Sequence, residues 1–254
     1  MAAVPDQQPA GIFQWPHRAI DPLFNLFFPK YCLVCKGLVE QRRFGGCCAR
    51  CWQDTEFFTS DSALCFKCGL PALGSKKTKA TVDCGQCRDH HYSKALALGP
   101  YADALRATVI EMKTTARLPA ILMGRIAEQL DGVPDLIIPV PLSRKRRFER
   151  GFNQAEVIAA ALSKLHAVPV DQKSLARTVH TVLHRAGMDR KKRAQTVAKA
   201  FAVVRKAPIR GKRILLVDDV LTSGATASAC AEHLLLGGAE SVRVFTLARA
   251  IVRK

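Results

Sequence analysis

The sequence predicts an α/β domain built around a parallel sheet and preceded by a small cysteine-rich module. Two observations support this division. Nine of the ten cysteines fall between residues 32 and 87, and from about residue 93 onward strand-like and helix-like segments alternate. Such alternation over about 160 residues is typical of strand–helix–strand units, which join their strands into one parallel sheet.

The elements of the α/β domain follow from their apolar patterns. LIIPVPL and ILLV are apolar runs without polar alternation, which is typical of strands buried on both faces of a sheet. The helical segments carry apolar residues three and four positions apart, and two glycines close the last of them. The expected strands cover residues 94–101, 135–142, 213–221 and 241–250, and the expected helices cover residues 102–114, 118–131, 152–166 and 224–238.

The cysteines form a repeat of four C-x-x-C pairs, with twelve residues between the first two pairs and fifteen between the last two. A two-residue gap allows a tight turn to aim both sulfurs at one ion, and two such pairs complete a tetrahedral Zn²⁺ site. Because four thiolates leave no open position for water, both zinc ions are expected to be structural. The predicted ligands are Cys32, Cys35, Cys48 and Cys51 in one site and Cys65, Cys68, Cys84 and Cys87 in the other.

Several alternatives stay open for the cysteines. A single C-x-x-C pair could be redox-active or form a disulfide, although the fourfold repeat favours zinc. Cys47 could replace Cys48 as a ligand, and His90 or His91 could act as a substitute ligand. Cys230 stands alone and is expected to be a small core residue.

The charge balance favours anionic partners. Basic residues outnumber acidic ones 39 to 21, so the formal net charge is +18. That excess is typical of proteins that meet polyanions, phosphorylated ligands or anionic membranes, and it does not choose among them. Three basic runs contribute to it, at residues 144–150, 185–193 and 205–213. A charge run of this kind is also compatible with a solvated face that has no partner.

The expected organisation has three parts. Residues 1–31 are predicted to be a tail with a short amphipathic helix that packs on the following domain, residues 32–92 a double zinc ribbon, and residues 93–254 the α/β domain. No stretch approaches the roughly 18 apolar residues of a membrane span. The N-terminus also lacks the basic and apolar regions of a secretory signal, so we expect a cytoplasmic protein.

RILLVDDVLTSGATASA, residues 213–229, is the segment that carries most of the functional information. A buried strand would deliver Asp218 and Asp219 to the carboxyl edge of the sheet, where open α/β sheets bind ligands. Residues 222–226 would turn into a helix whose N-terminus offers N–H groups and the positive end of its dipole to a phosphate. Two acceptor-only carboxylates beside such a turn suit a ribose phosphate. The acids would bind the 2′ and 3′ hydroxyls, and the turn would bind the 5′-phosphate.

Other motifs that combine a strand with acids fit less well. The sequence has no G-x-x-x-x-G-K-[ST] motif, which a P-loop site needs, and no G-x-G-x-x-G motif, which favours a dinucleotide site. A buried strand that simply ends in solvated acids is the remaining alternative, and the length of the motif makes it a poor explanation.

ILLVDDVLTSGAT, residues 214–226, resembles the 5-phosphoribosyl-1-pyrophosphate (PRPP) motif of type I phosphoribosyltransferases. More narrowly, the chain resembles the ComF family of competence-associated proteins from Ile20 to Arg249. The similarity includes both ribbons, YADALR at 101–106, PVPLSRKRRFERGFNQA at 139–155 and the pair Ala200-Phe201. Within it, RGFNQ at 150–154 is highly characteristic of the family.

The resemblance implies a phosphoribosyltransferase-like fold that binds PRPP with Mg²⁺ bridging pyrophosphate and ribose oxygens. The implied catalytic residues are Asp218, Asp219 and Arg150. The implied PRPP-binding residues are Val217, Asp218, Asp219, Thr222, Ser223, Gly224, Ala225 and Thr226, with Arg150 and Gly151 in the pyrophosphate loop.

Two departures from the family pattern leave catalytic turnover open. Thr196 stands where the family often has asparagine, and an expected glutamine is not evident around Thr181. An active phosphoribosyltransferase of nucleotide or nucleoside metabolism would displace pyrophosphate at the ribose C1, with Arg150 and the run at 185–193 neutralising the leaving group. A glutamine amidophosphoribosyltransferase is not expected, since Met1-Ala2 leads into a polar tail and leaves no room for a glutaminase domain.

The competing hypothesis is a binding protein for single-stranded DNA. Net positive charge, basic runs and zinc knuckles recur in proteins that bind single strands. Phe148 and Phe152 lie beside the first basic run, whereas Phe57, Phe58 and Phe66 are expected to fill the ribbon core. We favour a PRPP-binding protein that acts in DNA uptake or in the handling of single-stranded DNA. A DNA-uptake helicase is a candidate partner.

Overall fold

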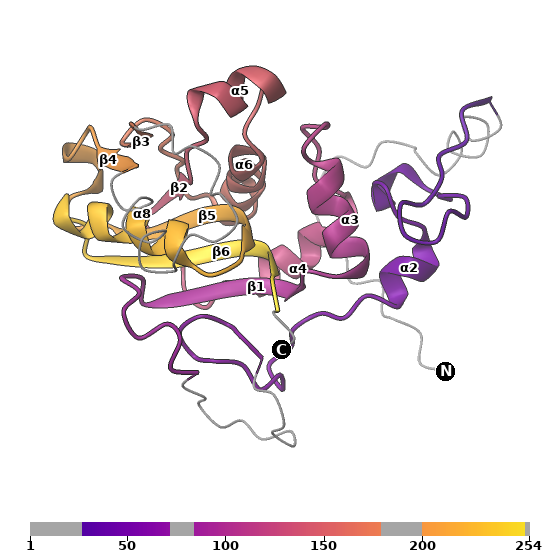
Figure 1. Ribbon diagram of the computed structural model, residues 1–254, viewed down its shortest axis with the longest axis horizontal. Helices are drawn as coiled ribbons and strands as arrows, with labels where there is room; N and C mark the ends of the chain where they lie inside the picture. Colours follow the sequence, from indigo (N-terminus) through magenta and orange to yellow (C-terminus); the bar gives the residue numbers. More distant parts are fainter. Residues whose placement is uncertain (1–26, 72–83, 179–199, 252–254) are drawn as a thin grey trace, which may run out of the picture.

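A four-stranded parallel sheet forms the centre of the computed structural model, which describes residues 27–71, 84–178 and 200–251 (Figure 1). Each neighbouring pair of strands is parallel, and the predicted α/β fold class is confirmed. In spatial order the strands are β1 (Lys94–Pro100), β6 (Ser241–Arg249), β5 (Arg213–Leu221) and β2 (Leu136–Pro139).

Side chains on the two faces of the sheet enter two separate cores, because successive residues of a strand point to opposite faces. On β5, Leu215 and Val217 pack on one face, and Ile214 and Leu216 pack on the other. The first face is covered by α3 (Asp103–Glu111), α4 (Met123–Glu128) and α6 (Gln154–His166). The second face is covered by α8 (Ala225–Leu236) and by a small antiparallel pair, β3 (Leu175–Arg177) and β4 (Phe201–Val203).

The first basic run forms a helix, α5 (Arg144–Arg150), which the apolar pattern did not predict. The hydroxyl of Ser143 accepts a hydrogen bond from the backbone N–H of Arg146 at 3.3 Å and caps the start of this helix. Gly151 ends α5 in the left-handed conformation, with a φ of 76°. The run at residues 185–193, Thr181 and Thr196 lie outside the described residues.

The helix expected at residues 118–131 is shorter than predicted and consists of η2 (Ala120–Leu122) followed by α4. Pro119 precedes η2, and the segment from Gln129 to Leu136 carries Gly132 and Pro134, which disfavour a continued helix. Three further short elements complete the described chain: η1 (Arg42–Phe44), α2 (Ala49–Gln53) and η3 (Ala207–Ile209).

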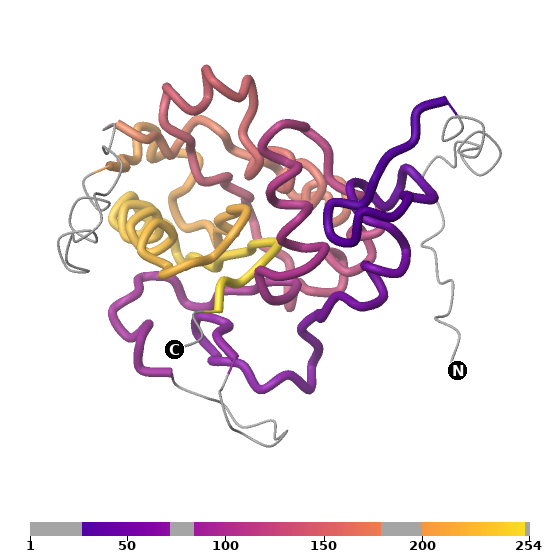
Figure 2. Tube along the Cα trace, turned by 45° about the vertical axis from the view of Figure 1, so that its right-hand side comes forward, coloured from indigo at the N-terminus to yellow at the C-terminus, as the bar shows by residue number. Residues whose placement is uncertain are grey.

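The two ribbons lie against different parts of the α/β domain, as Figures 1 and 2 both show. The first ribbon, residues 30–55, packs through α2 against α3. The second, residues 64–71 and 84–92, lies along β1 and joins the core that contains α8. The backbone N–H of Ala95 on β1 donates to the carbonyl of Lys67 at 2.7 Å, which fastens the second ribbon to the edge of the sheet.

Candidate functional site

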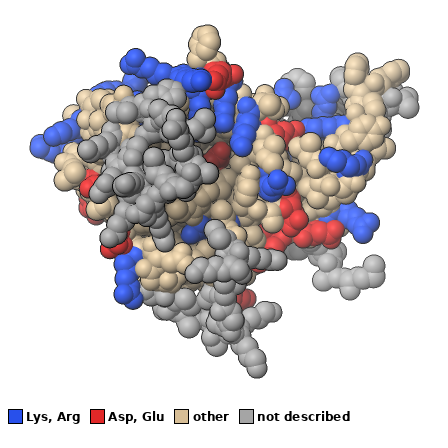
Figure 3. Space-filling view, viewed as in Figure 1, with Lys and Arg blue, Asp and Glu red and all other residues tan. Residues whose placement is uncertain are grey.

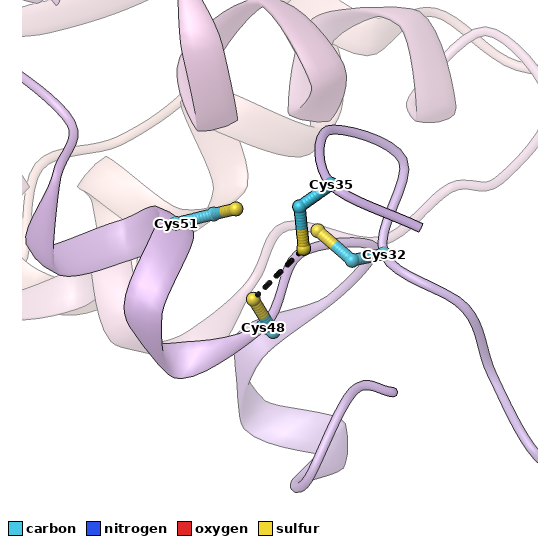
Figure 4. Close-up of side chains that lie close together, drawn as sticks. All are labelled: Cys32, Cys35, Cys48 and Cys51. Atoms are coloured by element: carbon cyan, nitrogen blue, oxygen red, sulfur yellow. Dashed lines mark hydrogen bonds between the residues drawn. The ribbon is translucent and has the colours of Figure 1, made fainter. Parts of the chain in front are cut away.

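Eight cysteines form two tetrads, and within each tetrad the four sulfur atoms lie within 4.8 Å of one another. In the first, the four side chains converge on one point, with Cys35 and Cys48 Sγ atoms 3.6 Å apart (Figure 4). In the second, Cys68 and Cys84 Sγ atoms are 3.5 Å apart. These separations fit the edge of a tetrahedral zinc–thiolate site, about 3.8 Å, and are far longer than a disulfide bond of about 2.05 Å. The tetrads are Cys32, Cys35, Cys48 and Cys51, and Cys65, Cys68, Cys84 and Cys87.

Both tetrads contain the N–H···S hydrogen bonds typical of zinc knuckles. The backbone N–H of Val34 donates to Cys32 Sγ, and that of Gly37 donates to Cys35 Sγ, each at 3.4 Å. In Cys32 and Cys65, burial alone would raise the thiol pKa, but backbone N–H groups outweigh it and lower the pKa to about 6. Burial and the neighbouring thiols raise the pKa of Cys51 and Cys87 in the same tetrads. Because zinc binds thiolates, the charge of the metal would have to offset these raised pKa values.

Cys48, and not Cys47, belongs to the first tetrad. The Cys47 side chain is fully buried, and its thiol lies 4.0 Å from the carbonyl of Ala104 in α3. Burial raises the pKa of Cys47 to about 12, which keeps it a neutral core residue. Cys230 is likewise completely buried.

His90 and His91 lie beside α8 rather than in a tetrad. The ring of His90 contacts the hydroxyl of Tyr92 at 2.7 Å, and the backbone N–H of His91 donates to Ser228 Oγ at 3.1 Å. The second tetrad is complete with four cysteines, so it does not need either ring as a substitute ligand.

Asp218 and Asp219 lie near the carboxyl end of β5. Val217 is fully buried, and its carbonyl accepts a hydrogen bond from Val140 N–H at 2.8 Å, so the strand is held from the side of β2 as well. Both aspartates are half-buried, whereas Thr222 and Ser223 beyond them are exposed. The strand therefore brings two carboxylates from the core to an accessible edge, as the motif predicted.

The environment of the two carboxylates disfavours their negative charge. Burial, followed by the neighbouring Asp219, raises the pKa of Asp218 to about 8. Burial also raises the pKa of Asp219, against the opposing effects of Lys113 and Arg150. Such raised pKa values occur at sites that gain stability when a ligand supplies hydroxyl donors or positive charge.

Residues 222–226, the phosphate turn, connect β5 to α8 through a left-handed glycine. Gly224 has a φ of 79° and is the N-cap of α8, without a capping side chain of its own. The first turn of a helix has N–H groups without intrahelical acceptors. Ser223 Oγ accepts from Ala225 N–H at 3.4 Å, and Ala225 and Thr226 are half-buried in the first turn. This arrangement can accept an anion.

Three cationic side chains from distant segments influence the carboxylates. Lys113 follows α3, and Arg150 is the last residue of α5; both lower the pKa of Asp219. Arg177, on β3, acts in the same direction on Asp218. Arg150 was named from the sequence, whereas Lys113 and Arg177 were missed, because no local pattern relates them to the motif. Gly151, next to Arg150, is exposed and ends α5.

The segment directly after β2 differs from the expected pyrophosphate loop. Val140–Ser143 follows the strand at the sheet edge, and Arg150 and Gly151 lie one helix further along the chain. Asn153 Nδ2 donates to the carbonyl of Val140 at 2.9 Å and ties the start of α6 to that segment. The RGFNQ motif therefore contributes a buried structural contact through its asparagine.

Comparison with known proteins gives the same two parts. The double zinc ribbon domain model matches residues 23–88, and the phosphoribosyl transferase domain model matches residues 122–254. The DNA utilization protein YhgH of Shigella flexneri is 29% identical over 238 residues, covering 89% of this chain and 100% of that protein. Competence protein F of Haemophilus influenzae is 31% identical over 238 residues, covering 88% of this chain and 99% of that protein.

A solved structure of the glutamine PRPP amidotransferase from B. subtilis, complexed with ADP and GMP, is also similar. The TM-score is 0.35 at 19% identity, and the match covers 50% of this chain and 27% of that chain.

Fold and site together define a phosphoribosyltransferase-like domain carried behind a double zinc ribbon. Relatives at this level of identity extend over nearly the whole length of the molecule. The chain belongs to the ComF family of competence-associated proteins. In the part of the chain that the structure describes, no helix combines the length and apolar character needed to cross a membrane.

Proposed function

We propose that the chain binds PRPP or a related ribose phosphate at the carboxyl end of β5, within an α/β domain of residues 93–254 that follows a tail at 1–31 and ribbons at 32–92. One observation carries the proposal. A half-buried carboxylate pair adjoins a helix N-terminus that opens on a left-handed glycine, and cations from three other segments face the pair. A ribose phosphate carries the complementary groups, hydroxyl donors at one end and phosphate at the other.

Each part of the ligand has residues suited to it. Asp218 and Asp219 would accept hydrogen bonds from the 2′ and 3′ hydroxyls. The N–H groups and hydroxyls of the phosphate turn, with the backbone after Val217, would hold the 5′-phosphate. Arg150 at the Gly151 turn, together with Lys113, would face the pyrophosphate. Mg²⁺, when bound with PRPP, would supply the charge neutralisation that pyrophosphate oxygens require, and it suits an oxygen-rich ligand set.

A thermal-shift experiment tests this site. Mg²⁺ and PRPP at about one hundred times the dissociation constant should stabilise the wild type by about 2.7 kcal/mol through ligand linkage. The double variant Asp218→Asn/Asp219→Asn, with an affinity at least tenfold weaker, should gain no more than about 1.4 kcal/mol under the same conditions. Equal shifts in the two proteins would place the ligand elsewhere.

We also infer a role in DNA uptake or in the handling of single-stranded DNA, in line with the names of the relatives. Lys and Arg side chains gather along the edge of the molecule that α5 forms (Figure 3). Phe148, in the middle of this basic helix, is 93% exposed. An exposed aromatic ring among cations is what single-strand binders use to stack a base beside the backbone. A DNA-uptake helicase would be the protein partner in such a role.

Phe57 and Phe58 lie in the segment that joins the two ribbons. Phe57 is half-buried and stacks on Trp52 with ring centroids 6.4 Å apart, so it packs on the core of the first ribbon, and Phe58 is buried. Phe66 is 50% exposed, and its assignment to the core was wrong. It lies between Cys65 and Cys68, in the first knuckle of the second ribbon.

Phosphoribosyl transfer is the second candidate function. The cations near Asp219 could neutralise a departing pyrophosphate, which is the chief electrostatic requirement of such a reaction. Incubation with Mg²⁺, PRPP and candidate acceptor bases, with pyrophosphate release as the readout, separates the two functions. Turnover that is lost in Asp218→Asn/Asp219→Asn would establish the enzyme. Binding without release would establish a ligand-binding protein.

A further inference from the structure

Arg249, the last residue of β6, is a buried arginine that joins the second ribbon to the phosphate turn. Its Nε donates to the carbonyl of Cys68 at 3.0 Å, and its Nη2 lies 4.0 Å from the Cys68 sulfur. Its Nη1 donates to the carbonyl of Leu221 at 2.8 Å and also to that of Thr222. One guanidinium therefore contacts a cysteine of the second tetrad and the backbone where the phosphate turn begins.

The same ribbon also packs directly on Gly224. A Cβ atom at this position would lie 2.6 Å from His90 Cε1 and 2.8 Å from the Tyr92 hydroxyl oxygen, so the two side chains close over the glycine. Between these two residues, the backbone N–H of His91 donates to Ser228 Oγ near the start of α8. The segment that follows Cys87 thus forms one wall of the phosphate turn.

An arginine suits this position better than a lysine. The guanidinium is a planar fork, so Nε and Nη1 can reach carbonyls on different segments at the same time, whereas an ammonium is a point charge on a flexible stem. Because the side chain is only 6% exposed, its charge is compensated by these carbonyls and the cysteine rather than by water. Two of its contacts, those of Nε and Nη2, are with Cys68, a member of the second tetrad.

The first ribbon makes its polar contacts elsewhere. Thr55 Oγ1 accepts from the backbone N–H of Ala104 at 3.3 Å, and Lys30 pairs with Glu111 at 2.6 Å, so this ribbon is fastened to α3. Its core residues lie on the opposite face of the sheet from α8. The first ribbon therefore contacts α3, whereas the second contacts the phosphate turn and α8.

We infer that Arg249 is a positioning residue, through which the second tetrad sets the shape of the phosphate turn. Metal at the second tetrad is then required for the shape of the phosphate turn, and so for ribose phosphate binding, whereas metal at the first tetrad is not required for the shape of the turn. The ligand part of this inference rests on the proposed function. The part that concerns the shape of the turn does not, because it rests on contacts between Arg249 and the backbone of Cys68, Leu221 and Thr222.

The first test compares Arg249→Lys with Arg243→Lys. Arg243 is a matched control on the same strand: its guanidinium donates to the Gly132 carbonyl at 2.7 Å and pairs with Asp131 at 2.9 Å, away from the turn. Amide hydrogen exchange of the peptide 221–228 in ligand-free protein should quicken about tenfold in Arg249→Lys, the effect of losing a buried hydrogen bond. It should be unchanged in Arg243→Lys, and both variants should retain wild-type zinc. Unchanged exchange in Arg249→Lys would overturn the inference.

The second test removes one metal at a time, with Cys84→Ser for the second tetrad and Cys35→Ser for the first. Each variant should lose about one zinc per chain, since each tetrad is a complete four-cysteine site. Only Cys84→Ser should quicken exchange at 221–228, and this variant should weaken Mg²⁺–PRPP binding by about tenfold or more. Equal effects of the two substitutions on exchange at 221–228 would overturn the inference. Failure of the wild type to bind PRPP would refute the proposed function instead, and the exchange result would still decide the role of Arg249.

Discussion

Asp218→Asn is expected to stabilise the protein in the absence of ligand while it weakens ligand binding. The carboxyl group has a pKa raised from 3.8 to about 8, first by burial and then by Asp219. The folded state therefore binds more protons than the unfolded state between these two values, and stability falls as pH rises through that window. An amide of the same shape carries no charge and removes this loss.

The magnitude follows from linkage. Each pH unit above 3.8 lowers the wild-type free energy of unfolding by about 1.4 kcal/mol until the pKa of the folded state is reached. The largest stabilisation that Asp218→Asn can give at pH 7 is therefore about 4 kcal/mol. Asp218 keeps some contact with solvent, which weakens the electrostatic penalty on its charge. We therefore expect Asp218→Asn to raise the free energy of unfolding by about 2 kcal/mol at pH 7, below that upper limit. The gain should be small near pH 4, grow up to about pH 8 and then stay constant.

Urea denaturation of both proteins at about pH 5, 7 and 8.5 measures this difference. The variant should have the higher free energy of unfolding, and the difference between the two proteins should grow as the pH rises. If the variant is equal to the wild type or less stable at every pH, the carboxylate is not held in an unfavourable environment, and the picture of a site poised for a ligand is wrong.

Four further outcomes are expected. Purified protein should contain about two zinc ions per chain, one for each tetrad, and a content near zero would refute the ribbons. Gly224→Ala should lower the free energy of unfolding by about 1–3 kcal/mol, because the residue has a φ of 79° and faces His90; an unchanged denaturation midpoint would contradict the geometry of the turn. Phe148→Ala should weaken single-stranded DNA binding by about 1–3 kcal/mol in a fluorescence titration, while Leu236→Ala, another exposed apolar side chain, should not. The wild-type affinity should also fall steeply with salt, and a salt-independent affinity would count against the basic face.

The parts of the fold that depend on burial could be predicted from the sequence. β5 was expected at residues 213–221 and spans Arg213–Leu221, because Ile214–Val217 face a core on both sides. The two ribbons follow from cysteine spacing, since a metal site fixes which sulfurs must meet. In both cases a strong local pattern carries the tertiary information.

Elements that depend on caps or on distant contacts could not be predicted. α5 has no buried residue, so it has no apolar stripe to reveal it, and Ser143 and Gly151 set its ends. β3 and β4 have only three residues each, too few for a periodic pattern.

The same limit applies within the site. Lys113 and Arg177 approach the carboxylates only because the sheet brings separate segments together. Arg249 looks like an ordinary charged strand end in the sequence, and only the fold shows that it is buried between a knuckle and the phosphate turn.

Isothermal titration of the full chain with PRPP and Mg²⁺ tests most directly whether the carboxylate pair and the phosphate turn bind a sugar phosphate. The wild type should bind about one ligand per chain, since the chain has one such turn within its described residues. Asp218→Asn/Asp219→Asn should bind at least tenfold more weakly, the loss expected when charge-assisted hydrogen bonds are removed. Equal affinity in the two proteins, or no heat of binding in the wild type, would contradict the account.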